Sequence, residues 1–400
     1  MSVQDDLVQT AQRLLINNYR QAPVVFSRGE GCRLWDVDGV RYLDMTAGIA
    51  VCVLGHCDPG LADVLSAQAR RLIHASNLYY LENQIRLAEA LTKRAFRGRV
   101  FFCNSGTEAN EAALKLARRY QAVVQKKPER VELVAFENGF HGRTMGALAV
   151  TGQAKYRDGF GPLVGPVRFL PYGDIAAARA GITSSTCAVI VEPIQAEGGI
   201  LLPPPGYLQE LRRHCTDVGA VVIFDEVQTG TGRTGTFYAF EKEGVVPDVV
   251  TLAKGLAGGV PIGAMLANEE VARGFEPGSH AATFGGNPLA TAGALYVQQA
   301  IDRENLLERC RDVGSYLGSA LLRLAERRRP RTRGARGRGL LPGLVLDGDA
   351  APVVAAAREA GLLISVAGGN VVRFAPALVV SKAVVDEALA ILDDVLGQGR

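Results

Sequence analysis

Between residues 60 and about 275, short apolar segments alternate with amphipathic helical patterns, and this alternation constrains the fold more than any other feature. The apolar segments have strand length and occupy 99–103, 132–136, 188–192, 220–225 and 248–253. The helical patterns occupy 82–94, 108–120 and 207–218. Continuous runs of Val, Ile and Phe predict strands buried on both faces, and helices between such strands indicate parallel pairing. We therefore expect an α/β fold with a mainly parallel sheet between helices.

The regions outside this alternation predict further helices and a hairpin. Helices are expected at about 4–17, 287–302, 304–328 and 382–396. The dipeptide Asp38-Gly39 lies between two short apolar segments and is typical of a tight hairpin turn. The C-terminal tail has a βαβ-like pattern that ends in the last of these helices.

The length of the chain predicts more than one domain. Its 400 residues exceed the roughly 250–300 residues at which a single core stops growing. We expect a large domain at residues 60–285 and a smaller α/β C-terminal domain at residues 286–400, with a long connecting helix. Residues 1–59 are expected to form an N-terminal segment, a helix and a hairpin, that belongs to the smaller domain.

Composition argues against several functional classes. Apolar residues make up 48% of the chain, which is ample for a packed core, but no apolar run approaches the roughly 18 residues of a membrane span. The N-terminus lacks a secretory signal pattern, so we expect a cytoplasmic protein with no membrane partner. A formal charge of +3 is too small to indicate nucleic acid as a partner, and the seven cysteines and five histidines lack metal-ligand spacing.

One basic cluster stands out, ERRRPRTRGARGR at residues 326–338, which holds seven arginines. We interpret it as a solvated helix end followed by a loop. Binding of an anionic ligand or of RNA is the alternative interpretation.

The segment VVIFDEVQTGTGRTG, residues 221–235, contains the G-x-G-x-x-G spacing of a dinucleotide-binding turn. Such a turn follows its strand directly and opens a helix, with an acid about 20 residues further on. Here the residues at 225–228 separate the strand from the glycines, and the later segment VVTLAKG ends in lysine. A nicotinamide-dependent oxidoreductase is therefore only a remote alternative, and we expect a tight loop whose backbone passes near a ligand.

Three features instead indicate a different cofactor. Asp225 and Lys254 each end a predicted buried strand, and the carboxyl ends of parallel strands meet at the ligand-binding edge of a sheet. A turn containing Ser105, Gly106 and Thr107 enters a helix, and its free N–H groups suit a phosphate. A lysine amine, a phosphate cup and a buried aspartate together describe a site for pyridoxal 5'-phosphate, although a salt bridge without chemistry would also explain Asp225 and Lys254.

The chain resembles the class III, fold-type-I pyridoxal-phosphate-dependent aminotransferases over nearly its whole length. The resemblance rests on FFCNSGTEANEAALKLAR, FHGRTMGAL, VEPIQAEGG, FDEVQTGTGRTG, TLAKGL and ATFGGNP. It implies that Lys254 binds the cofactor aldehyde and moves the proton, that Asp225 partners the ring nitrogen, and that Thr283 contacts the phosphate of a neighbouring subunit in a homodimer. The cofactor-binding set that it implies is Ser105, Gly106, Thr107, Phe140, Asp225, Glu226, Val227, Gln228, Lys254 and Thr283.

The resemblance also implies the substrates. Transfer of the terminal amino group of N2-acetylornithine to 2-oxoglutarate, a step of arginine biosynthesis, is the implied reaction. Arg143 and Arg373 resemble the arginines that bind substrate carboxylates, and Glu197 resembles a switch that masks Arg373. Five positions depart from the family pattern: Cys52, Asp58, Ala196, Ala282 and Ala377. The alternatives are therefore other ω-amine donors, namely ornithine, succinylornithine, 4-aminobutyrate or a lysine-pathway amine.

Overall fold

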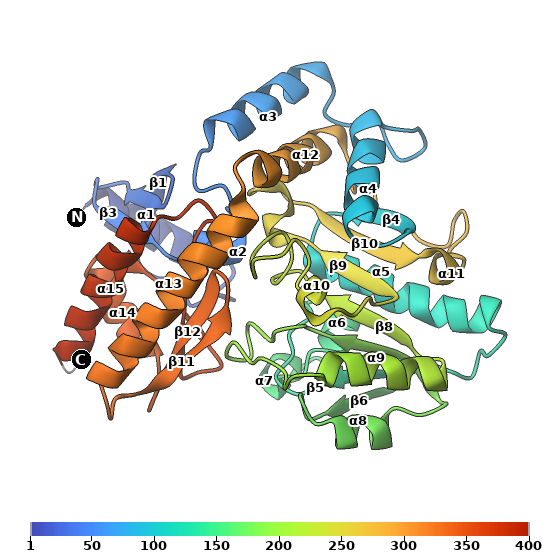
Figure 1. The fold of residues 1–400 in the computed structure, drawn as a ribbon. Helices are drawn as coiled ribbons and strands as arrows, with labels where there is room; N and C mark the ends of the chain where they lie inside the picture. Colours follow the sequence, from blue (N-terminus) through green and yellow to red (C-terminus); the bar gives the residue numbers. More distant parts are fainter. Residues whose placement is uncertain (1, 399–400) are drawn as a thin grey trace.

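The computed structural model describes residues 2–398 and contains three sheets within them (Figure 1). The largest has seven strands in the order β4-β10-β9-β8-β7-β5-β6. Their bounds are Gly98–Cys103 (β4), Glu132–Phe136 (β5), Val167–Leu170 (β6), Thr186–Val191 (β7), Val221–Asp225 (β8), Val249–Leu252 (β9) and Gly263–Asn268 (β10). Strands β6, β5, β7, β8 and β9 pair in parallel, so the expected mainly parallel sheet is confirmed.

All the strands predicted in this region are present, and two further strands were missed. Strand β10 pairs antiparallel with both β4 and β9, and its sequence follows a glycine-rich stretch that indicates a loop rather than a strand. Strand β6 is short, carries an exposed arginine and lies between two prolines. Both strands are therefore held by pairing with their neighbours more than by their own apolar pattern.

Helices cover both faces of the large sheet (Figure 1). Alternate residues of a strand face opposite sides, so Leu133 packs in the cluster beneath α5, whereas Val134 packs in the cluster on the α9 side. The helices of this part are α3 (Pro59–Arg71), α4 (Glu82–Arg94), α5 (Gly106–Arg119), α6 (Met145–Ala149), α7 (Ala154–Arg157), α8 (Ile175–Gly181), α9 (Tyr207–Val218), α10 (Phe240–Glu243) and α11 (Glu269–Ala272). Helix α5 begins two residues before its predicted start because Ser105 caps it.

The two smaller sheets join the ends of the chain. One contains β1 (Phe26–Glu30), β2 (Arg33–Asp36), β3 (Arg41–Asp44) and β13 (Leu362–Leu363); the other contains β11 (Thr332–Arg338), β12 (Leu341–Leu346), β15 (Val371–Arg373) and β14 (Ser365–Ala367). The expected hairpin joins β2 to β3, and the Asp36 carboxylate accepts hydrogen bonds from the backbone N–H groups of Asp38 and Val40. Because β3 pairs in parallel with β13, the N-terminal hairpin lies beside the C-terminal part of the chain. The domain boundaries themselves stay predictions.

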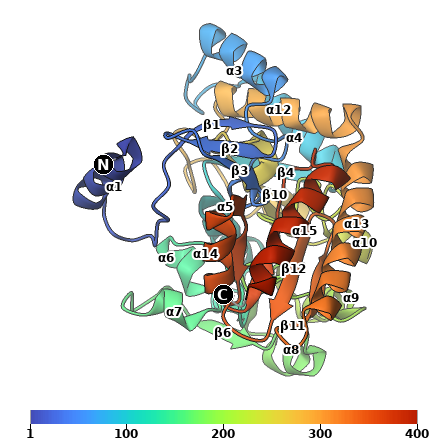
Figure 2. The same ribbon diagram turned by 90° about the vertical axis from the view of Figure 1, so that its left-hand side faces the viewer.

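The remaining helices differ in their surroundings: the last three pack against these sheets, whereas the first stands apart from them (Figure 2). They are α1 (Val3–Leu14), α2 (Ala47–Ala50), α12 (Pro288–Arg303), α13 (Leu306–Arg327), α14 (Ala351–Glu359) and α15 (Lys382–Gly397). The interpretation of residues 326–338 as a helix end and loop is wrong in its second half, because residues 332–338 form β11 and pair with β12. No helix within residues 2–398 is long and apolar enough to span a membrane.

Candidate active site

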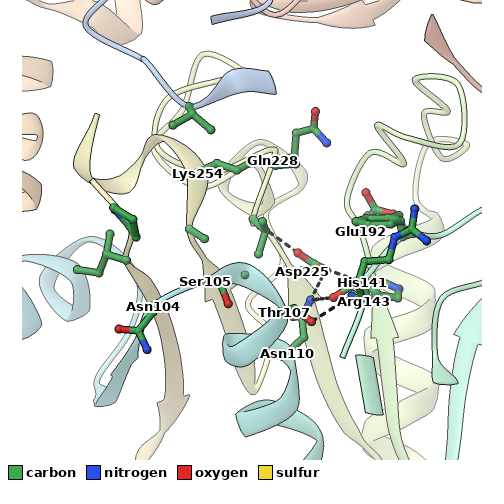
Figure 3. Close-up of a pocket in the computed structure, with 18 of the residues that line it drawn as sticks. Asn104, Ser105, Thr107, Asn110, His141, Arg143, Glu192, Asp225, Gln228 and Lys254 are labelled. Atoms are coloured by element: carbon green, nitrogen blue, oxygen red, sulfur yellow. Dashed lines mark hydrogen bonds and ion pairs between the residues drawn. The ribbon is translucent and has the colours of Figure 1, made fainter. Parts of the chain in front are cut away.

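A cavity of about 440 Å³ opens at the carboxyl ends of β8 and β9 (Figure 3). Both Asp225, the last residue of β8, and Lys254, two residues after β9, line it. The start of α5 forms a second wall, and the loop that contains Phe140 and Arg143 forms a third. The sheet edge thus brings together side chains that are more than 100 residues apart in the sequence, as expected for a parallel α/β fold.

Lys254 starts a short 3-10 turn and holds a backbone φ of +41°, a conformation that non-glycine residues rarely adopt. Its side chain faces the cavity, where burial lowers the pKa of the amine. Glu197 opposes that shift and Arg373 adds to it, but the net direction is downward. A lysine with a lowered pKa has a larger neutral fraction and is therefore a better nucleophile towards a carbonyl carbon.

Asp225 is buried and held by three hydrogen-bond donors (Figure 3). Its Oδ2 lies 2.8 Å from Nδ1 of His141 and accepts a hydrogen bond of 2.8 Å from Nδ2 of Asn110. Its Oδ1 accepts the backbone N–H of Val227 at 3.0 Å. The Asn110 amide is itself fixed, because its Oδ1 accepts the hydroxyl of Thr251 at 2.8 Å. This network orients one carboxylate oxygen and places negative charge at the cavity wall.

The N-terminus of α5 forms a compact cup. Ser105 caps the helix by accepting the backbone N–H of Glu108 at 3.3 Å. The hydroxyl of Thr107 lies 2.8 Å from that of Thr144 and accepts the backbone N–H of Arg143 at 3.2 Å. Helix N-termini combine free N–H groups with the positive end of the helix dipole. The cup is therefore suited to a phosphate group.

Gly106 is required by close packing within this cup. A Cβ atom at this position would lie 2.6 Å from Cγ1 of Val227, which is closer than real Cβ atoms approach other heavy atoms. Val227 in turn lines the cavity beside the cup, and Phe140 lines the wall that also carries Arg143. The guanidinium of Arg143 lies 4.0 Å from the ring centroid of Tyr156, so this cation is supported by a stacked ring at the cavity mouth.

Glu197 and Arg373 form an ion pair beside the cavity. Gln228 joins them, since its Nε2 donates to Glu197 Oε1 at 3.2 Å and its Oε1 accepts from Arg373 Nη1 at 3.2 Å. The Nε atom of Arg373 donates to Ser365 Oγ at 3.1 Å. Burial alone would raise the pKa of Glu197, but Arg373 and Lys254 outweigh it and hold that pKa below its usual value. The carboxylate is therefore ionised and neutralises the buried guanidinium of Arg373.

Comparison with known proteins identifies the family. The Aminotransferase class-III family profile matches residues 15–396. The chain is a class-III aminotransferase. It is 51% identical to an acetylornithine aminotransferase of Gloeobacter violaceus, over 98% of this chain and 97% of that protein. It is 46% identical to one of Caldanaerobacter subterraneus subsp. tengcongensis, over 98% of this chain and 100% of that protein.

Solved structures agree with this assignment. The aminotransferase resembles the ornithine aminotransferase from Toxoplasma gondii ME49 with a TM-score of 0.96 and 32% identity, over 100% of this chain and 97% of that one. It resembles the N-acetylornithine aminotransferase from Stenotrophomonas maltophilia K279a with a TM-score of 0.84 and 35% identity, over 98% and 99% of the two chains. The remote alternative of a nicotinamide-dependent oxidoreductase is thereby excluded.

The aminotransferase uses pyridoxal 5'-phosphate, as its family does, and a structure of the Toxoplasma gondii ornithine aminotransferase records partial occupancy of this cofactor at the active site. The residues present here fit the group. The start of α5 offers its backbone N–H groups to a phosphate, the buried Asp225 carboxylate can accept from a ring N–H, and the Lys254 amine lies in the same cavity. When bound, pyridoxal phosphate takes the amino group from one substrate and gives it to another.

Two predicted cofactor-binding residues and one loop lie elsewhere. The buried carboxylate of Glu226 accepts the backbone N–H groups of Ala239 and Phe240 and does not line the cavity, so its role in cofactor binding stays a prediction. Thr283 lies outside this cavity, in a separate hollow with Ala282. The glycine loop does not line the cavity either, since Gly232 packs against Leu307 and Leu378, and its approach to a ligand stays a prediction.

The sequence reasoning missed three polar residues of the site: Asn110, His141 and Glu192. The first two hold Asp225, and Glu192 accepts the backbone N–H of Phe140 at 2.9 Å. Burial raises the pKa of Glu192 to about 7. His141 follows Phe140 directly and Asn110 follows Glu108 by two residues, so both lie within motifs already singled out. Their contacts to Asp225 were not readable from spacing, because they join residues 84 and 115 positions apart.

Three of the departures from the family pattern have distinct surroundings. Asp58 caps α3 by accepting the backbone N–H of Leu61 at 2.8 Å, so the acid there has a structural role. Ala196 is buried, and its backbone N–H donates to Glu192 at 3.3 Å. Cys52 is a free thiol beside His56. None of these three residues lines the cavity that contains Lys254.

Proposed function

We propose that this class-III aminotransferase transfers the terminal amino group of N2-acetyl-L-ornithine to 2-oxoglutarate. The products are N-acetyl-L-glutamate 5-semialdehyde and L-glutamate, and the reversible reaction belongs to arginine biosynthesis in the cytoplasm. The observation that carries the proposal is the identity of 46–51% to acetylornithine aminotransferases over 98% of the chain. Ornithine aminotransferases are also among its structural relatives, so ornithine is the second candidate donor.

Each cofactor-binding residue has a proposed task that its contacts support. Lys254 binds the cofactor aldehyde through Nζ and moves the proton at the substrate carbon, which its lowered pKa favours. Asp225, fixed by His141 and Asn110, holds the proton of the ring nitrogen. The α5 N-terminus with Thr107 binds the phosphate.

The remaining cavity residues position the ring and the substrates. Val227, Phe140 and Gln228 line the cavity, where Val227 and Phe140 would hold the cofactor ring and Gln228 would bond its phenolic oxygen. Arg143 binds the α-carboxylate of the donor, because a planar guanidinium pairs with a carboxylate through two hydrogen bonds. Arg373 binds an α-carboxylate of glutamate or 2-oxoglutarate only after Glu197 has moved away.

The protein is proposed to work as a homodimer with shared active sites. Thr283 and Ala282 border a hollow that also contains the exposed Tyr80, and Phe284 next to them is exposed as well. Exposed aromatic residues of this kind are enriched at protein interfaces. In a dimer, Thr283 of one subunit would contact the cofactor phosphate held by its partner.

The deciding experiment is a half-reaction without 2-oxoglutarate. The holoenzyme is mixed in turn with acetylornithine, ornithine, succinylornithine and 4-aminobutyrate, and loss of the visible absorbance of the bound cofactor is followed. We expect acetylornithine to act fastest at the lowest concentration; a faster reaction with another donor would reassign the substrate. Lys254→Ala is the control, since loss of the covalent link and of the proton carrier should lower the rate by more than about 10³-fold.

A further inference from the structure

A second pocket, of about 430 Å³, lies apart from the active-site cavity and shares no lining residue with it. Its walls come from three places in the chain. Thr234 and Lys242 come from the segment that follows β8, a row of small residues comes from α13, and Arg336 and Arg338 come from β11. Strand β11 is the end strand of its sheet, so its outer edge borders this space. The arginine-rich segment, which the proposed reaction does not use, therefore forms one wall of a concave site.

The charge of this pocket is strongly positive. Lys242, Arg311, Arg336 and Arg338 line it. Among residues 2–398 only Arg338 of these four has a carboxylate partner, Glu243 at 2.7 Å. The other two arginines donate to backbone carbonyls instead, Arg336 to Gly199 at 2.9 Å and Arg311 to Gly235 at 2.6 Å.

One neighbouring carboxylate, Glu243, pairs with Arg338 and offsets its charge. Arg233, adjacent to Thr234, is buried and donates to carbonyl oxygens, and burial lowers its pKa to about 10. Burial also lowers the pKa of Arg336. Positive groups gathered in a concave site concentrate a field that attracts anions.

Thr234 contributes a hydroxyl to the pocket wall. Thr234 is 4% exposed, lines the pocket, and its Oγ1 has no hydrogen-bond partner among the described residues. Buried hydroxyl groups in folded proteins are almost always hydrogen-bonded, so this one can take a further partner. Ser315 and Ser319 add two more hydroxyls to the wall formed by α13.

Glycines on α13 create the space. A Cβ atom at Gly314 would lie 2.5 Å from the backbone of Gly339, so helix and loop touch at the base of the pocket. One turn later, a Cβ atom at Gly318 would meet nothing within 4 Å. The pocket therefore has its floor at Gly314, where helix and loop are in contact, and has free space beside Gly318. Its volume falls in the range of small-molecule sites.

We propose that this pocket is a binding site for a small metabolite that carries two or more carboxylate or phosphate groups. Lys242 and Arg311, which have no carboxylate partner among residues 2–398, and the Thr234 hydroxyl supply the matching donors. RNA fits less well. Four arginines of the cluster outside the pocket are engaged by carboxylates, Arg327 and Arg328 with Asp393, Arg329 with Glu326 and Arg333 with Asp347, which interrupts a basic surface for a strand.

The test uses the holoenzyme and two probes, citrate for carboxylates and inorganic pyrophosphate for phosphates, in titration calorimetry. Gly318→Leu fills the open part of the pocket, and leucine is a better helix former than glycine, so folding should persist. Lys242→Gln removes one exposed cation. Lys127→Gln is the matched control, because Lys127 is an exposed lysine that lines neither this pocket nor the active site.

We expect at least one probe to bind the wild type and the Lys127→Gln variant equally. Lys242→Gln should weaken that binding by about threefold to fivefold, and Gly318→Leu should abolish it, while turnover stays unchanged in all variants. Which probe binds better identifies the anionic group. The proposal is overturned if neither probe binds, if all variants bind equally, if binding responds only to Arg143→Ala, or if only a single-stranded RNA oligonucleotide binds.

Discussion

The guanidinium of Arg373 and the carboxylate of Glu197 neutralise each other at the edge of the active-site cavity, and the amide of Gln228 bonds to both. Arg373 is 3% exposed, so it has little water to solvate it if Glu197 leaves. A substrate carboxylate can replace the Glu197 carboxylate charge for charge. We therefore expect the pair to let one cavity accept both a substrate that needs Arg373 and one that does not.

Removal of the Glu197 carboxylate should shift substrate preference. In Glu197→Ala, Arg373 is permanently available, so the half-reaction with glutamate should gain about tenfold relative to that with acetylornithine. The ratio of kcat/KM values from single-turnover absorbance measures this. Glu137→Gln, at an exposed position, is the control. An unchanged ratio in Glu197→Ala would show that Glu197 does not mask Arg373.

Substitution of Arg143 should change KM for both substrates, since the amino donor and the amino acceptor each present a carboxylate. We expect Arg143→Ala to raise KM for acetylornithine and for 2-oxoglutarate by about 10- to 100-fold. Arg143→Lys should recover only part of this, because an ammonium cannot form the planar, bidentate pair or stack on Tyr156 in the same way. Steady-state kinetics with each substrate varied would reveal the pattern, and a change in KM for one substrate alone would contradict the shared role.

The packing of Gly106 against Val227 should control how tightly the cofactor is held. Gly106→Ala puts a Cβ atom 2.6 Å from Val227 Cγ1, so the cup must shift. We expect cofactor release on dialysis to become about tenfold faster, at a cost of about 1–3 kcal/mol for the overpacked contact. The double variant Gly106→Ala with Val227→Ala removes the clashing methyl groups and should retain cofactor better than Gly106→Ala alone. Equal release from both would show that the contact is not responsible.

Glu226 should make stability depend on pH. Burial raises the pKa of this carboxyl from 4.5 to about 8. Between those values the folded protein holds a proton that the unfolded chain releases, so the free energy of unfolding should fall as pH rises, by up to about 1.4 kcal/mol per pH unit. Denaturant unfolding from pH 5 to pH 8 measures the slope.

Glu226→Gln should flatten that slope, because glutamine does not titrate. Glu137→Gln, an exposed position, should leave it as in the wild type. If the slope is the same in Glu226→Gln and the wild type, the folded protein does not hold a proton on Glu226 in this range.

The residues that sequence reasoning placed correctly are those at the ends of buried strands. Asp225 and Lys254 each follow a continuous apolar run, and parallel pairing of β8 with β9 brings those ends to one edge. The next residue along the chain, Glu226, does not line the cavity. Glu226 belongs to the same motif as Asp225, but successive side chains at a strand end point to opposite sides, so Glu226 turns into the protein towards Ala239.

Contacts between distant segments account for the other differences. Asn110 and His141 reach Asp225 only because α5 and the loop after β5 pack over the end of β8. Strand β11 has the composition of a basic loop, and its conformation depends on the ladder to β12. Local pattern therefore predicted five of the seven strands of the large sheet, whereas the polar network of the site depends on tertiary packing.

The pairing of β3 with β13 sets an order for folding during synthesis. The ribosome makes β3 by residue 44, but its partner strand does not exist until residue 363 has been added. The large sheet, in contrast, lies wholly within residues 98–268 and can assemble while the chain is still growing. The N-terminal hairpin therefore stays without its partner strand until after the large sheet can have formed. A truncated chain that stops before residue 362 leaves the edge of β3 unpaired and able to pair with other chains.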